Sequence, residues 1–122
     1  MKCLIIEDSK LDAEIMLNHI KKNRPYAKLT VCNRFIDGAK ALHNDAYDVI
    51  FLDLNLPDNW GISSIRDIKK YAHLAPIIVT TGFTSKTTIE EAKNAGAALV
   101  FKKRDITSET IAGLMGSQEM VG

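Results

Sequence analysis

The stretch DVIFLDLNLPDNWG, residues 48–61, decides the fold that the sequence predicts. Its apolar run at residues 49–52 is typical of a strand buried on both faces, and the run stops at an acid, Asp53. Pro57 and Gly61 indicate that a loop, and not a helix, follows this strand directly. A carboxylate at the end of a buried strand, in front of a loop, indicates a site at the edge of a sheet.

Short apolar runs alternate with segments of helical spacing on either side of this stretch. Five runs predict strands: residues 3–6, 28–32, 48–53, 76–81 and 98–102. Because each run is continuously apolar and a helical pattern follows it, the strands are expected to form a parallel sheet that is covered on both faces. We therefore expect a doubly wound α/β fold, a flavodoxin-like three-layer sandwich with strand order 2-1-3-4-5, as one domain over residues 1–122.

The composition argues against several classes of function. Of 122 residues, 46% are hydrophobic, and 16 basic against 15 acidic side chains leave a formal charge of +1. This balance gives no support for direct nucleic-acid binding or for a membrane-surface partner. No apolar stretch reaches the roughly 18 residues of a membrane span, and the first residues are too few for a signal peptide, so we expect a cytoplasmic protein. Cys3 and Cys32 are then expected as buried reduced thiols.

Charged and polar side chains follow the predicted strands at the edge where a doubly wound sheet binds ligands. Glu7 and Asp8 follow the first strand, and Asp53 ends the third. Thr81 ends the fourth strand, and Lys103 follows the fifth. Two like charges about 4 Å apart repel by roughly 4 kcal/mol at an effective dielectric constant near 20. Three converging carboxylates therefore predict a hard divalent cation, Mg²⁺ or Mn²⁺, beside the lysine.

In order and spacing, these motifs resemble those of response-regulator receiver domains of two-component signalling, in particular the single-domain, chemotaxis-regulator-like kind. The resemblance covers essentially the whole chain. It includes Asn55, Pro57 and Gly61 after Asp53, and the Ala-Gly-Ala sequence at residues 95–97 before the fifth strand. An acidic pair alone is a weak signal, but four separated motifs in this order are highly specific.

The resemblance implies a phosphoacceptor in signal transduction that is not a conventional enzyme. Asp53 would take a phosphoryl group from the phosphohistidine of a histidine kinase or a histidine phosphotransfer protein. Lys103 and Thr81 would contact the phosphoryl oxygens, and Asn55 would offer its backbone carbonyl to the metal. The metal ligands implied are Glu7, Asp8, Asp53 and Asn55. The downstream target stays open, and the resemblance is compatible with a monomer or a weak dimer.

The sequence departs from the family pattern at three positions. Arg104 follows Lys103 where the family usually has a proline. We expect the Lys103–Arg104 peptide to be trans, because a cis bond before a non-proline residue costs about 2.5–4 kcal/mol, and we expect Arg104 to face solvent or a nearby acid. Val100 stands where an aromatic residue is frequent, and Phe101 should face the other side of the strand. Trp60 is expected to pack partly over the loop or to dock a partner.

Two apolar positions near the predicted site have open roles. Leu11 follows the acidic pair, and it is expected either in the core or on a surface that docks the phosphoryl donor. Phe83 lies two residues after Thr81, where the resemblance implies a side chain near the path of water to the phosphoryl group. A bulky ring there should slow loss of the phosphoryl group.

Three other functions remain as alternatives. A pseudo-receiver, a module that binds partners without phosphorylation, is slightly favoured by Arg104 and Val100 but disfavoured by the complete acid set. A flavin or nucleotide binder of the same fold needs a glycine-rich phosphate loop, whereas the first loop, residues 7–10, is acidic and lacks glycine. A phosphohydrolase needs a second acid near its nucleophile, and position 55 is an asparagine.

Overall fold

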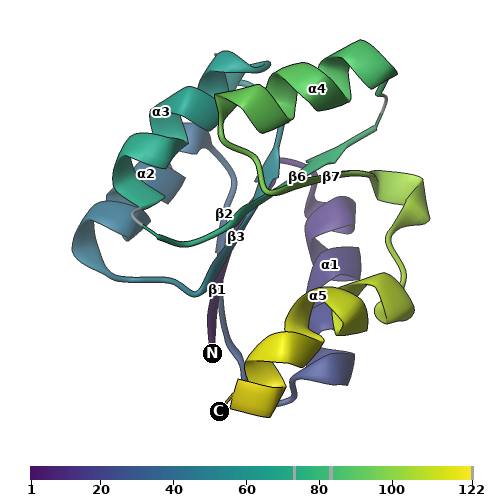
Figure 1. Ribbon diagram of the computed structural model, residues 1–122. Coiled ribbons are helices and arrows are strands. Elements are labelled where there is room, and N and C mark those ends of the chain that lie inside the picture. Colours follow the sequence, from purple (N-terminus) through teal and green to yellow (C-terminus); the bar gives the residue numbers. More distant parts are fainter. Residues whose placement is uncertain (73, 83, 122) are drawn as a thin grey trace.

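The structure is a computed structural model that describes residues 1–72, 74–82 and 84–121 (Figure 1). Five parallel strands form one sheet in the order β2-β1-β3-β6-β7. Their bounds are β1 Lys2–Ile6, β2 Lys28–Cys32, β3 Val49–Asp53, β6 Ile77–Thr81 and β7 Leu99–Lys102. In chain order this is the predicted arrangement 2-1-3-4-5, and each strand ends within one residue of its predicted limits. The doubly wound fold is confirmed.

Helices cover both faces of the sheet (Figure 1). One face carries α1 Lys10–Asn23 and α5 Ser108–Val121, and the other carries α2 Phe35–Asn44, α3 Ser63–Ala72 and α4 Lys86–Ala95. Two apolar clusters lie between these layers, and adjacent residues of β7 belong to different clusters. Val100 packs in the cluster under α2, α3 and α4, whereas Phe101 packs in the cluster under α1 and α5, as predicted. No described helix is both long and apolar enough to span a bilayer.

Local sequence signals account for three of the helix ends, at the start of α1 and at both ends of α4. Ser9 caps α1, because its hydroxyl accepts a hydrogen bond from the Asp12 backbone N–H at 3.2 Å. Ser85 caps α4 in the same way, and Gly96 ends that helix with φ of +124°, a conformation that favours glycine. α5 continues through Gly116 to Val121. A glycine weakens a helix by about 1 kcal/mol but keeps the backbone N–H that makes the helical hydrogen bond.

The segment after β3 is more ordered than predicted. Instead of a plain loop it forms a small antiparallel hairpin, β4 Asn55–Leu56 and β5 Asn59–Trp60. Gly61 closes the hairpin with φ of +86°, and its N–H donates to the Leu54 carbonyl at 2.8 Å. The hairpin fixes the backbone immediately after Asp53.

Asp58, at the turn of this hairpin, ties it to the neighbouring helix. Its two carboxylate oxygens accept hydrogen bonds from the backbone N–H groups of Phe35 at 2.7 Å and Ile36 at 2.9 Å. N–H groups in the first turn of a helix have no partner within that helix, and a negative charge is favourable there. Burial raises the pKa of Asp58, but together these hydrogen bonds outweigh it and lower the pKa. Asp58 therefore stays ionised and holds the hairpin against α2.

Candidate phosphoacceptor site

The register of the parallel strands explains why the predicted acids meet. Ile6 of β1 is paired with Leu52 of β3. Their successors, Glu7 and Asp53, therefore leave adjacent strands at the same edge of the sheet. Cys3 and Cys32, on the adjacent strands β1 and β2, are buried free thiols as predicted.

Three carboxylates gather at this edge. Glu7, Asp8 and Asp53 each offer an oxygen, and these oxygens all lie within 4.8 Å of one another. Asp53 is 1% exposed and Glu7 5% exposed, whereas Asp8 is open to solvent. The cluster is thus a set of hard oxygen ligands with one side toward water, the chemistry that Mg²⁺ prefers.

Only one of the two oxygens of the Asp53 carboxylate accepts a hydrogen bond from a described residue. Its Oδ1 accepts a hydrogen bond from the Asn55 backbone N–H at 3.1 Å. Its Oδ2 is buried and has no hydrogen-bond partner among the described residues. A buried acceptor in this state is unfavourable by about 1–3 kcal/mol unless an ion or another group completes it. The residues therefore fit a bound cation or an incoming electrophile.

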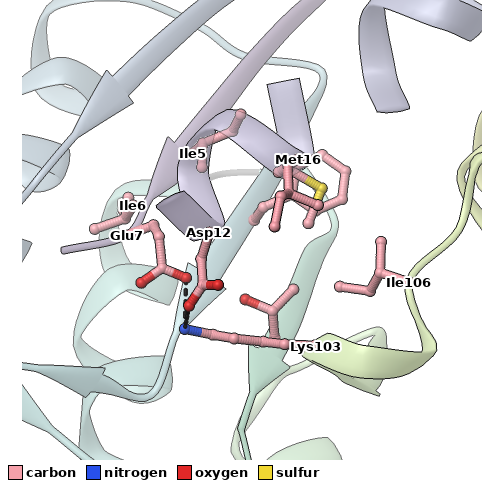
Figure 2. A pocket seen from close by; sticks show the side chains of 10 residues that line it. Ile5, Ile6, Glu7, Asp12, Met16, Lys103 and Ile106 are labelled. Carbon is pink, nitrogen blue, oxygen red and sulfur yellow. Dashed lines mark hydrogen bonds and ion pairs between the residues drawn. The ribbon is translucent and has the colours of Figure 1, made fainter. Parts of the chain in front are cut away.

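Lys103 is the cation of the site, and its ammonium is bonded to Glu7 and Asp12 (Figure 2). Its Nζ is 2.7 Å from Glu7 Oε1, 2.9 Å from Asp12 Oδ2 and 3.6 Å from Asp53 Oδ2. Asp12 was not among the predicted site residues. Its position in the first turn after the acidic pair was the only signal in the sequence.

Burial and charge shift the ionisation of two of these groups. Burial and the adjacent Asp53 carboxyl raise the pKa of Glu7 from 4.5 to about 7, although Lys103 opposes the shift. Burial lowers the pKa of Lys103, but its bonds to Glu7 and Asp12 and the charge of Asp53 outweigh this and hold the pKa above its usual value. Lys103 therefore stays a cation, and Glu7 titrates near neutrality without metal.

Three further predicted residues, Thr81, Asn55 and Trp60, lie in the hairpin or beside it. Thr81 is buried at the end of β6, and it lines a pocket of about 390 Å³ together with Asn55, Trp60 and Thr88. Trp60 is 74% exposed and lines this pocket beside Asn55, so it covers the loop only in part, and a role in docking a partner stays a prediction. The Asn55 backbone is beside Asp53, because its N–H donates to the Asp53 carboxylate; that its carbonyl binds the metal stays a prediction.

The structure tests the expectations for two positions that flank the site, Arg104 and Leu11. Arg104 is exposed, with its Nε 3.9 Å from Asp105 Oδ1, and the described residues include no cis peptide, so both predictions for Arg104 are confirmed. Leu11 is 67% exposed on α1, which excludes a core role. Phe83 lies outside the described residues, and its role stays a prediction.

Comparison with known proteins identifies the family. The model of the response regulator receiver domain matches residues 3–112, and the chain belongs to this family. The sensory transduction protein LytR of Staphylococcus saprophyticus is 34% identical over 82 residues, which are 65% of this chain and 31% of that protein. The autoinducer 2 sensor kinase/phosphatase LuxQ of Vibrio harveyi is 30% identical over 104 residues, 84% of this chain and 12% of LuxQ. The chain thus spans less than a third of the length of these two relatives.

A solved structure agrees with this assignment. The signal receiver domain of a DNA-binding response regulator from Colwellia psychrerythraea is 26% identical and superposes with a TM-score of 0.87 over 98% of both chains. The chain is therefore a receiver domain of the two-component response-regulator family, a signalling domain. That all of residues 1–122 form one functional unit stays a prediction.

Proposed function

We propose that this receiver domain accepts a phosphoryl group on Asp53 from the phosphohistidine of a histidine kinase or a histidine phosphotransfer protein. The observation that carries the proposal is the Asp53 Oδ2 atom, a buried carboxylate oxygen without a hydrogen-bond partner among the described residues, 3.6 Å from the Lys103 ammonium. An acid kept in this state is poorly solvated and therefore suited to attack an electrophile.

In the transfer, an oxygen of Asp53 forms the new O–P bond while the P–N bond of the donor breaks. The electron pair of that bond stays with the imidazole nitrogen, which then takes a proton. Catalysis of such a step depends on alignment and charge neutralisation. The hydrogen bond from Asn55 N to Asp53 Oδ1 holds the carboxylate in place, and Lys103 supplies a positive charge. Thr81, buried at the end of β6, would donate its hydroxyl to a phosphoryl oxygen.

Glu7, Asp8, Asp53 and the Asn55 carbonyl would hold Mg²⁺ or Mn²⁺. When bound, the ion would neutralise charge on the phosphoryl oxygens. The acid cluster within 4.8 Å supports this ligand set.

The product, an acyl phosphate, adds one to two negative charges at the edge of the sheet. We expect this charge to pull Lys103 and Thr81 toward the phosphoryl group and so to change a surface that docks a downstream target. The usual aromatic partner of such a switch is absent, because Val100 occupies that position and Phe101 packs on the opposite face of the sheet. Any docking surface must therefore respond through Thr81 and Lys103 themselves.

The proposal is tested by intact mass after incubation with a small phosphodonor such as acetyl phosphate. We expect the wild type to gain one phosphoryl group in the presence of Mg²⁺ and to lose this gain with a chelator, and the Asp53→Asn variant to gain none. A folded, Mg²⁺-loaded wild type that stays unmodified, with acetyl phosphate and with a histidine phosphotransfer donor alike, would favour the pseudo-receiver alternative.

A further inference from the structure

We propose that Asp12 is a positioning residue that holds the Lys103 ammonium away from Asp53, and that it thereby limits how tightly the site holds a phosphoryl group. The inference rests on the proposed phosphoryl acceptance at Asp53. It concerns the ion pair between α1 and the segment after β7, which the known motifs of the chain do not include.

The geometry shows a competition for one ammonium group. Lys103 Nζ is within hydrogen-bond distance of Glu7 Oε1 at 2.7 Å and of Asp12 Oδ2 at 2.9 Å, but its distance to Asp53 Oδ2 is 3.6 Å. An ammonium has three N–H donors, and two of them point to Glu7 and Asp12 (Figure 2). Asp53 Oδ2 is left without a hydrogen bond among the residues described here. Lys103 thus neutralises Asp53 only by its charge.

The position of Asp12 is fixed by the start of α1. Its backbone N–H donates to the Ser9 hydroxyl at 3.2 Å in the N-terminal cap of this helix. Its side chain is 35% exposed and that of Lys103 is 23% exposed, so water screens the pair only in part. Asp12 therefore presents a fixed negative charge to Lys103 from outside the acid cluster.

Lys103 also has space in which to move. Beside its stem lies a cavity of about 40 Å³, lined by Asp12 and by apolar side chains that include Met16 and Ile106 (Figure 2). A long unbranched side chain with free volume at its flank can turn about its own bonds without displacing the backbone. A shift of the ammonium toward a phosphoryl oxygen on Asp53 would lengthen and weaken its contact with Asp12.

Removing the charge of Asp12 should then favour the phosphorylated arrangement. The probe is beryllofluoride, which adds to the acceptor carboxylate in place of a phosphoryl group, titrated by calorimetry at saturating Mg²⁺. We expect Asp12→Asn to bind beryllofluoride about two- to fivefold more tightly than the wild type, the range of a partly screened ion pair. Asp12→Glu, which can restore the pair, should bind close to the wild-type affinity. Glu14→Gln, which removes an exposed acid of the same helix, should leave the affinity unchanged.

A double-mutant cycle separates positioning from plain repulsion. If Asp12 acts by holding Lys103, the effect of Asp12→Asn disappears in a Lys103→Met background. If Asp12 only repels the anion, the effect persists or grows there, and the inference is wrong. The inference also fails if folded Asp12→Asn binds as the wild type does, or more weakly. A wild type that binds no beryllofluoride and takes no phosphoryl group contradicts the proposed function, and with it this inference.

Discussion

Replacing Asp53 by asparagine should stabilise the metal-free protein, although it removes the proposed acceptor. At pH 8 the carboxylates of Glu7 and Asp8 are charged, and their oxygens lie within 4.8 Å of one from Asp53. At an effective dielectric constant near 20, the two repulsions amount to roughly 7 kcal/mol, against about 5 kcal/mol of attraction from Lys103 at 3.6 Å. Solvent around Asp8 reduces its share. We therefore expect Asp53→Asn to raise the free energy of unfolding by roughly 1–2 kcal/mol.

The same variant should lose most of its response to Mg²⁺. For the wild type, Mg²⁺ at about ten times its Kd should add roughly 1.4 kcal/mol to the free energy of unfolding. Urea denaturation at pH 8, with and without MgCl2, measures both effects on the same pair of proteins. The reasoning is refuted if metal-free Asp53→Asn is less stable than the wild type, or if both proteins gain equally from Mg²⁺.

Three further predictions concern single side chains near the site. Because the folded protein raises the Glu7 pKa from 4.5 to about 7, it binds that proton more tightly than the unfolded chain, so metal-free stability should fall as pH rises between these values. Denaturation across this range should show a flatter profile for Glu7→Gln, and an unchanged slope would contradict the assignment. Leu11→Ala should leave the melting temperature nearly unchanged, because Leu11 is exposed, but should slow transfer from a phosphohistidine donor severalfold in a stopped-flow assay; transfer at the full rate would exclude docking at Leu11. Phe83→Ala should shorten the half-life of the phosphorylated form, followed by intact mass over time, and an equal or longer half-life would exclude shielding by the ring.

The main elements were predictable from the sequence because they depend on periodic patterns. Buried parallel strands are continuously apolar, and helix caps such as Ser85 and Gly96 have a strong local preference. The β4–β5 hairpin was missed because strands of two residues are too short to show an alternating pattern. Its order depends instead on Asp58 binding the first turn of α2, a contact between segments far apart in the chain.

The sequence predicted which residues of the site lie close together. It did not predict which of them form ion pairs or hydrogen bonds with one another. Strand ends bring Glu7 and Asp53 together in any sheet of this order, so their proximity followed from topology. Topology did not predict which acid Lys103 binds, because a long side chain can reach several acids and only the packed structure selects among them. Asp12 is 91 residues away from Lys103 in the sequence, and its position in the first turn after the acidic pair was the only signal for it.

The central claim, that Asp53 is the phosphoacceptor, is tested most directly by locating the modification. Borohydride reduces an acyl phosphate on aspartate to homoserine, which peptide mass spectrometry can assign to a position in the chain. After treatment with acetyl phosphate and Mg²⁺, we predict homoserine at position 53 and unmodified aspartate at positions 8 and 12. Homoserine at another acid, with position 53 unchanged, would contradict the account.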